Sequence, residues 1–366
     1  MTTQRIYLLN LVLVLALALG GCSRPSAAAP APVNQPANAA PVEAGITHIP
    51  AQAAIASPTV VAIEPQTEAE TLAGGPLAAL ITEPETFPPL NRTVNILLLG
   101  SDRRPKEVNW RTDVLMLIAL DLENSQAAAI SLPRDIYLDV IPGHKPNKIN
   151  VVDYLGEQDD PGNGPELLAS ILEEKLGIPI HHFLRFEFES FKQVVDALGG
   201  VELNIECRVY EYLPEEDINL YLEPGVQRLE GKMALGYVRA RNQGGDLERA
   251  RRQQRMVLAV RDQLLAENQL PHLPALYAAL NDSVKTDIGF VDAIRFARFG
   301  LNLSEADIHG VVISPPDMVR ADWRGGMSVW VADWPKIAEQ IQTVFERPPL
   351  FETNTVGETG DRVQCP

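Results

Sequence analysis

The stretch Val94–Gly100 reads VNILLLG, a largely apolar run that ends in a glycine. Such a run predicts a buried strand of the kind found in α/β proteins. A second run, TDVLMLIALDLE from Thr112, and a third, AAAISLPRDIYLDVIPG from Ala127 and extending past Pro133, predict two further strands. Residues 121–125, which join the second and third runs, form a connection short enough for a hairpin.

Helical and strand patterns alternate along the rest of the chain. The predicted helices cover residues 164–177, 189–200, 229–238, 273–280, 290–301 and 332–345. The predicted strands cover residues 181–191, 201–206 and 308–313. Because the region shows no internal repeat and no natural break, we predict a single α/β domain over residues 93–347, with helices on both faces of a mixed central sheet.

The N-terminus carries a targeting signal. Ile6–Leu19 is an apolar run of 14 residues interrupted by Asn10, shorter than the roughly 20 residues that a membrane-spanning helix needs. It indicates a signal peptide over residues 1–21. The following LGGC, which ends at Cys22, resembles the bacterial lipobox and implies cleavage before Cys22 and its lipidation. An uncleaved anchor helix is the alternative. Both place the rest of the chain outside the cytoplasm, tethered to the cell membrane.

Residues 22–92 have the composition of an extended linker. The stretch SRPSAAAPAPVNQPANAAPVEAG is rich in proline and alanine and cannot bury a core. Beyond Cys22, the remaining cysteines are Cys207 and, in a C-terminal tail over residues 348–366, Cys365. In an exported protein these two cysteines either pair or remain free thiols. No Cys/His cluster has the spacing of a zinc site.

The charge distribution is uneven. The net charge is −17, which together with export argues against nucleic acid as a partner. Tyr237–Arg261, in contrast, reads YVRARNQGGDLERARRQQRMVLAVR and has a local charge of +5 from seven arginines and two acids. A cationic island in an acidic protein indicates a local anionic ligand. Guanidinium matches phosphate oxygens two at a time and stays charged when desolvated, so we predict a phosphate ligand.

The arginines lie where an anion would be held. Gly244 and Gly245 predict a turn, Asp246 a helix N-cap, and the helix is expected to run from about Leu247 toward Glu267. The helix dipole disfavours cations near the N-terminus, whereas free N–H groups there bind phosphate. The alternative is a solvated charged face, with intrahelical pairs formed by the acid at position 248.

Three other stretches carry candidate ligand groups. Asp102 and Asp113 lie at the ends of neighbouring predicted strands, where two carboxylates can share Mg²⁺ with phosphate oxygens. Arg134 lies at a strand terminus, where α/β folds place ligand groups. Lys148, in NKIN, is another phosphate-capable cation. Taken singly, these residues are better explained as turn or strand-edge aspartates, a surface ion pair and a solvated lysine.

Together these stretches resemble one family. In order, the chain carries NILLLGSD, RTD, SLPRD, KIN, ALGGVEL, GYVRAR and GDLERARRQQ. This series resembles the LytR-CpsA-Psr family of bacterial cell-envelope proteins. The resemblance implies an α/β/α sandwich and a phosphotransferase. Such an enzyme moves a glycopolymer, for example teichoic acid or capsular polysaccharide, from an undecaprenyl pyrophosphate carrier to a peptidoglycan hydroxyl.

The resemblance also implies roles for particular residues. By motif position, Asp102 and Asp113 would hold Mg²⁺. The residues that would bind the pyrophosphate substrate are Arg111, Arg134, Arg239, Arg241, Arg249 and Arg252. Lys148 is added to this predicted set on its own chemistry, as a phosphate-capable cation. The residues predicted to be catalytic are Asp113, Arg134 and Arg241. Arg255 and Arg261 lie further from the start of the helix and are predicted not to bind.

Some features depart from the family pattern. The run after KIN is VVDYLGE, where members commonly have a tyrosine and two glycines, and this change affects the acceptor side. A lipobox stands where members usually have a transmembrane helix. Four phenylalanines are candidates to line an isoprenoid tunnel, although ordinary core packing is the more common explanation: Phe183, Phe186, Phe188 and Phe191. The alternative functions are pyrophosphatase action on the carrier and non-catalytic, regulatory binding of a polyprenyl phosphate.

We expect the mature protein to begin at a lipidated Cys22, because the 14-residue apolar run ends in LGGC. Mass spectrometry of the mature N-terminus checks this prediction. A chain that keeps Met1, or an unmodified Cys22, would contradict it.

Overall fold

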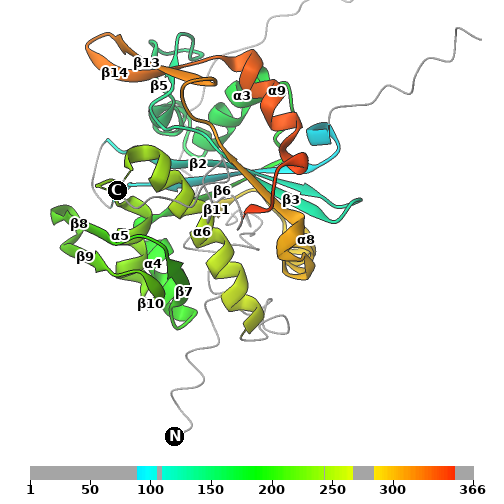
Figure 1. Ribbon diagram of the computed structural model, residues 1–366. Helices are drawn as coiled ribbons and strands as arrows, with labels where there is room; N and C mark the ends of the chain where they lie inside the picture. Colours follow the sequence, from blue (N-terminus) through cyan, green and yellow to red (C-terminus); the bar gives the residue numbers. More distant parts are fainter. Residues whose placement is uncertain (1–88, 105–108, 243, 267–283, 351–366) are drawn as a thin grey trace, which may run out of the picture. The chain divides into compact units, whose positions relative to one another are not determined.

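A computed structural model of the protein describes residues 89–104, 109–242, 244–266 and 284–350. Their centre is a six-stranded sheet (Figure 1). In spatial order its strands are β11 (Val284–Thr286), β6 (His182–Glu187), β1 (Val94–Ser101), β2 (Thr112–Asp121), β3 (Gln126–Ser131) and β12 (Ile308–Val312). The run VNILLLG therefore forms a buried strand, as predicted, and the structure places it in the interior of the sheet.

The sheet is mixed. β1 pairs antiparallel with β2 and parallel with β6, and β2 and β3 form the predicted antiparallel hairpin. β12 is parallel to β3, and β11 is antiparallel to β6. The third strand ends at Ser131, so the expectation that it extends past Pro133 was wrong. Proline has no N–H to donate to a strand ladder, and the backbone N–H of Leu132 already bonds to Leu115.

Side chains of β1 alternate between two hydrophobic clusters. Ile96 and Leu98 belong to one cluster, and Leu97 and Leu99 to the other. This alternation follows from the two-residue period of a strand. Because both faces are apolar, helices must cover both.

Four helices contribute to the cluster on the Ile96 face: α4 (Phe188–Ala197), α5 (Gly231–Arg239), α6 (Gly245–Ala266) and α8 (Phe290–Asn302). Three contribute to the opposite cluster: α2 (Val152–Asp159), α3 (Gly164–Leu176) and α9 (Trp334–Gln342). Figure 1 shows α3 and α9 on one side of the sheet and α4, α5, α6 and α8 on the other. The predicted fold class, a mixed sheet with helices on both faces, is confirmed.

Several elements differ from the sequence-based predictions. The strand predicted over residues 181–191 ends at Glu187, where α4 begins. The strand predicted over residues 201–206 is β7 (Val201–Ile205), but its partner β10 (Gly225–Leu229) was not predicted. Three further short pairs were not predicted: β4 (Tyr137–Leu138) with β5 (Asn147–Lys148), β8 (Val209–Leu213) with β9 (Ile218–Leu222), and β13 (Val319–Arg324) with β14 (Met327–Ala332). The ends of α3 and α4 were predicted correctly, because Gly177 and Gly199 adopt the left-handed conformation there.

Some predictions lie outside the described residues. These are the signal peptide, Cys22, the linker up to residue 88, the helix predicted over 273–280, and Cys365. Cys207 is disulfide-bonded. Within the described ranges, no helix is long and apolar enough to span a bilayer.

We expect Gly231→Ala to lower the free energy of unfolding by about 1–3 kcal/mol. An added Cβ at Gly231, where α5 begins, would lie 2.3 Å from the carbonyl oxygen of Lys192 on α4. The matched control is Gly300→Ala in α8, where an added Cβ would meet no atom within 4 Å. That change should leave stability unchanged or raise it by up to about 1 kcal/mol. Urea unfolding measures both, and equal effects would contradict a tight α4–α5 contact.

Candidate functional site

A cavity of about 310 Å³ lies against the Ile96 face of the sheet, bordered by α4, α5 and α6. Its lining changes character along the two central strands. Leu98 on β1 and Met116 on β2 are apolar, whereas Asp102 and Asp113, at the adjoining strand ends, are acidic. Four residues of extended chain span about 13 Å. The cavity therefore has an apolar interior and a polar mouth.

Two carboxylates lie at the mouth. The backbone of Asp102 bonds to the carbonyl oxygen of Arg111 at 3.0 Å, and its Oδ1 accepts the Arg111 N–H at 2.5 Å. Burial raises the pKa of the Asp102 carboxyl. The Arg111 hydrogen bond opposes this, and the negative charge of Asp113 adds to the rise. The sequence prediction that these two acids come together is thus met by the geometry.

Arg134 links the mouth to a neighbouring acid. Its Nη1 donates to Asp113, and its Nε lies 3.7 Å from Asp135. Burial alone would lower the pKa of Arg134, but Asp113 and Asp135 raise it above its usual value. Lys148 Nζ bonds to Asp135 at 2.8 Å. Lys148 is therefore connected to the site through Asp135 and does not line the cavity.

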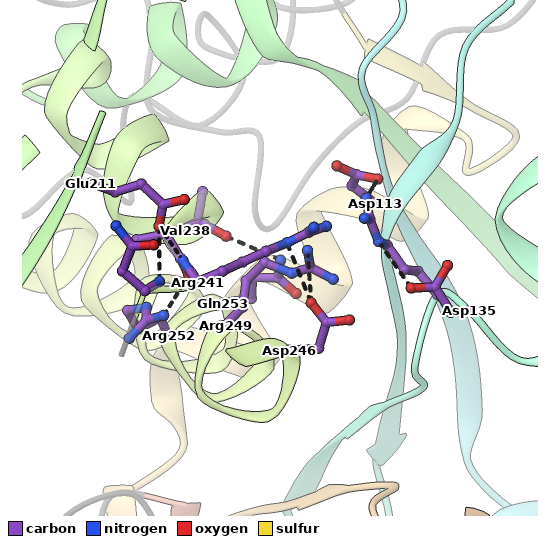
Figure 2. A network of polar contacts seen from close by, with 12 residues as sticks. Asp113, Asp135, Glu211, Val238, Arg241, Asp246, Arg249, Arg252 and Gln253 are labelled. Atoms are coloured by element: carbon purple, nitrogen blue, oxygen red, sulfur yellow. Dashed lines mark hydrogen bonds and ion pairs between the residues drawn. The ribbon is translucent and has the colours of Figure 1, made fainter. Parts of the chain in front are cut away.

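A second cationic group comes from the connection between α5 and α6. One oxygen of Asp246 lies 3.3 Å from Arg241 Nε and 3.2 Å from Arg249 Nη1. Figure 2 shows this carboxylate between the two arginines, with Asp113 and Asp135 opposite. Burial lowers the pKa of Arg249 to about 10; Asp246 opposes this, while Arg134 and Arg241 contribute to it. One carboxylate neutralises the charge of only one of these two guanidiniums, so a further anion could bind between them.

The predicted N-cap was wrong. The helix begins at Gly245, after a left-handed Gly244, so Asp246 is already helical. Its carboxylate pairs with arginines instead of capping the helix, because Arg241 and Arg249 bring two positive charges within ion-pair distance.

Arg239 enters the mouth from the last turn of α5. Its guanidinium lies 4.4 Å from the centre of the Phe188 ring and 3.6 and 3.7 Å from Glu215 and Glu216. Arg239 Nη1 and Arg134 Nε are buried and have no hydrogen-bond partner within the described part of the chain. Buried donors without partners are costly, and ligand oxygens would satisfy them.

Not every predicted arginine faces the cavity. Arg111 is exposed and contributes its backbone, and the lining does not include its side chain. Arg252 is buried and donates to the carbonyl oxygen of Ala240. Arg249 and Arg252 were predicted to share a helix face toward the ligand. Of these two, Arg249 lines the cavity and Arg252 does not. The two distal arginines bond to other groups, Arg255 to Glu206 at 2.6 Å and Arg261 to the Gly300 carbonyl oxygen at 2.9 Å.

Sequence reasoning missed the acids that hold the arginines. Glu211 accepts the N–H of Arg241, and that of Asn242 at 3.1 Å. Glu216 pairs with Arg239 across a long stretch of sequence. Only the alternating pattern of β8 could have shown that Glu211 faces inward.

The phenylalanines divide between the two faces of the sheet. Phe186, Phe188 and Phe191 line the cavity, whereas Phe183 packs in the opposite cluster. The general expectation of core packing therefore holds for Phe183, and the other three combine core packing with cavity lining.

The residues at the mouth suit a cation that is shared with a ligand. Within the described chain, no group of three or more His, Cys, Asp or Glu side chains gathers as a metal cage. Mg²⁺ is usually held by one or two carboxylates together with phosphate oxygens and water. Asp102 and Asp113 match that donor set, although Arg134 already neutralises part of their charge.

The fold and the site thus define an α/β protein whose cavity joins an arginine-rich mouth to an apolar interior. A family model, LytR_cpsA_psr, matches residues 79–346. The chain belongs to the LytR-CpsA-Psr family.

Two relatives illustrate the range of names in the family. Regulatory protein MsrR of Staphylococcus aureus (strain COL) is 34% identical over 198 residues, which are 53% of this chain and 56% of MsrR. The chain thus spans little more than half of that relative. The polyisoprenyl-teichoic acid–peptidoglycan teichoic acid transferase TagU of Oceanobacillus iheyensis is 31% identical over 234 residues, which are 60% of this chain and 69% of TagU.

Solved structures share the fold. YwtF (TagT) of Bacillus subtilis, with bound octaprenyl pyrophosphate lipid, superimposes with a TM-score of 0.51 at 22% identity. The match covers 71% of this chain and 93% of that chain.

We expect Arg249→Lys to weaken binding of inorganic pyrophosphate in the presence of Mg²⁺ by about tenfold or more, because lysine cannot replace the forked donor. Arg252→Lys should instead lower thermal stability, because it loosens the hold on Ala240. Arg251→Lys, whose arginine pairs with Glu248 on the same helix, is the control. Calorimetric titration and thermal melts measure both effects. An Arg252 variant that lost affinity without losing stability would restore Arg252 as a ligand.

Proposed function

We propose that this protein transfers a glycopolymer phosphate from an undecaprenyl pyrophosphate carrier to a peptidoglycan hydroxyl. The observation that carries the proposal is the cavity, whose lining joins four arginines and four acids, Asp102 and Asp113 among them, to an apolar interior. A polyprenyl pyrophosphate has the same two parts, a charged head and an apolar tail. The activity named for TagU and the lipid bound in the TagT structure support this assignment.

The apolar interior would hold the tail. A second cavity of about 140 Å³ lies on the same face and shares Leu98 and Val257 with the first. The apolar lining thus continues along the sheet toward α8, as a long isoprenoid requires. Each buried methylene contributes about 0.8 kcal/mol of binding free energy. Specificity for a long chain would come from this surface.

The mouth would bind the pyrophosphate. Arg134, Arg239, Arg241 and Arg249 lie around it, and two of them have buried donors that a phosphate oxygen would satisfy. Negative charge grows on the bridging oxygen as the polyprenyl phosphate leaves. Preorganised guanidiniums stabilise that charge without having to reorganise.

The reaction forms a bond between the acceptor hydroxyl oxygen and the phosphorus that carries the glycopolymer. It breaks the bond from that phosphorus to the bridging oxygen. The hydroxyl proton passes to a carboxylate at the mouth, and Asp113 could accept it where Mg²⁺ does not fully engage that carboxylate. Asp102 and Asp113 would hold Mg²⁺, which would supply further positive charge beside the phosphates.

The N-terminal prediction is consistent with this role. Lipidation at Cys22 would tether the linker over residues 22–92 to the outer side of the cell membrane. The domain over residues 93–347 would then work next to a lipid-linked donor and the peptidoglycan acceptor.

Two other activities make different products. Pyrophosphatase action would release glycopolymer phosphate into solution, and a regulatory binder, as MsrR is named, would make no product. Incubation with a lipid-linked glycopolymer, peptidoglycan fragments and Mg²⁺ distinguishes the three. A covalent glycopolymer–peptidoglycan product supports the proposal. If the wild-type protein is folded and this product does not form, the proposal is contradicted.

We expect Asp113→Ala to lower Mg²⁺-dependent turnover by about 100-fold or more, because it removes a mouth carboxylate. Thermal stability should change little. Asp135→Ala is the matched control, since it takes a carboxylate from the same Arg134 but does not alter the cavity lining. Equal losses of turnover in the two variants, in proportion to lost stability, would make Asp113 a structural residue.

We expect Arg241→Lys to weaken polyprenyl pyrophosphate binding by about 10- to 100-fold, although it keeps the charge. Arg261→Lys should leave that affinity nearly unchanged. It should lower the melting temperature, because Arg261 tethers α6 to the Gly300 carbonyl oxygen. The measurements are affinity and turnover at fixed Mg²⁺. Wild-type affinity in the Arg241 variant would mean that this arginine is only a solvated charge.

A further inference from the structure

A buried ionic cluster lies on the face of the sheet opposite the cavity. Arg185 on β6 is 1% exposed, and its Nη1 lies 2.7 Å from Asp153 and 2.9 Å from Glu157. The two acids are four residues apart on α2, so they share a helix face. Lys285 lies 3.6 Å from Glu157 and balances the second negative charge. Both acids belong to the run VVDYLGE, to which the proposed function assigns no role.

This cluster contacts the beginning of β2. The hydroxyl of Thr112 bonds to Asp153 at 3.2 Å. The guanidinium of Arg185 lies 5.3 Å from the centre of the Trp110 ring. The rings of Trp110 and Tyr154 on α2 form a T-shaped contact with 5.8 Å between centroids. The side chains of Trp110 and Thr112 therefore both contact the ionic cluster or α2.

The register shift at the start of β2 places the functional residues. Asp113 is the extra residue between the pairs Gly100–Val114 and Ser101–Thr112. The Thr112 hydroxyl bonds to Asp153 in the cluster, whereas Asp113 lies on the cavity side. The Arg111 backbone bonds to Asp102. The residues that the cluster holds thus alternate with those that form the mouth.

The cluster is costly as a stabilising element. Replacing a complete buried ion cluster by apolar side chains is often neutral or stabilising. Here Arg185 Nη2 has no hydrogen-bond partner within the described residues. Packing around Asp153 is also tight. A Cβ added at Gly164 would lie 2.2 Å from the backbone carbonyl oxygen of Asp153 and 2.2 Å from its Oδ1. These features indicate that the cluster orients its neighbours on β2 more than it adds to the free energy of unfolding.

We infer that Arg185, Asp153 and Glu157 form a positioning unit that sets Asp113 and the Arg111 backbone at the mouth from the opposite face of the sheet. They touch neither substrate nor metal. The catalytic part of this inference rests on the proposed function, whereas the structural part stands without it.

The test uses two variants and one control. The first variant, Arg185→Met/Asp153→Asn/Glu157→Gln, removes the charges together, so that no single charge is left buried alone. The second, Thr112→Val, removes only the hydroxyl that joins β2 to the cluster. The control, Ile337→Ala on α9, removes apolar contacts in the core of the same face. Amide hydrogen exchange over residues 109–113, melting temperature, apparent Mg²⁺ affinity, KM and kcat are measured on the full chain.

The expected result is faster exchange confined to residues 109–113 in both variants. Apparent Mg²⁺ affinity and kcat should fall by on the order of 10- to 100-fold, with KM for the lipid nearly unchanged. The control should lower the melting temperature at least as much without these effects. Exchange and kcat that merely follow the melting temperature across all three variants would overturn the inference. If wild-type protein made no product, the proposed function would fail, and the exchange comparison would still decide whether the unit positions β2.

Discussion

The pairing of β1 with β2 is the constraint on which the site depends. The antiparallel register runs from Val94 opposite Leu120 to Gly100 opposite Val114, and it shifts before Ser101 pairs with Thr112. An added Cβ at Gly100 would lie 2.6 Å from the Val114 side chain, so a glycine is required at this close approach. Beyond the last pair, the backbones at positions 102 and 111 still bond to each other. Two carboxylates distant in sequence therefore reach the same mouth.

The opposite side of the mouth depends on charge balance. A chain with a net charge of −17 brings four arginines to one cavity, and each of them also lies near an acid. These acids hold the guanidiniums in place around the cavity. They do not saturate the guanidiniums. Arg249 and Arg241 share one carboxylate, and among the described residues Arg134 Nε and Arg239 Nη1 have no hydrogen-bond partner. Such a partly compensated cluster combines a stable fold with affinity for an anion.

The two faces of the sheet contribute different properties. The Ile96 face contains two adjoining cavities, which share Leu98 and Val257 in their linings. The opposite face contains a second hydrophobic cluster and the Arg185 ion cluster. A site built on strand ends needs a rigid support, because small displacements of ligand groups weaken both metal and phosphate contacts. The face with the two cavities can accept a ligand because the contacts on the opposite face fix the positions of the strands.

The amino-acid sequence by itself determined the parts of this protein that depend on local periodicity and turn chemistry. Apolar runs specify the central strands, amphipathic spacing specifies the helices, and glycines after α3 and α4 specify where those helices end. The ordered motifs also indicated the family and the arginines that could meet a phosphate. Only the tertiary structure decided which of those arginines face the cavity. Arg249 and Arg252 are three residues apart on one helix, yet one faces the mouth and the other binds the carbonyl of Ala240. Spacing limits which side chains can share a helix face, whereas the direction of that face and the acids that meet it depend on packing between segments far apart in the chain.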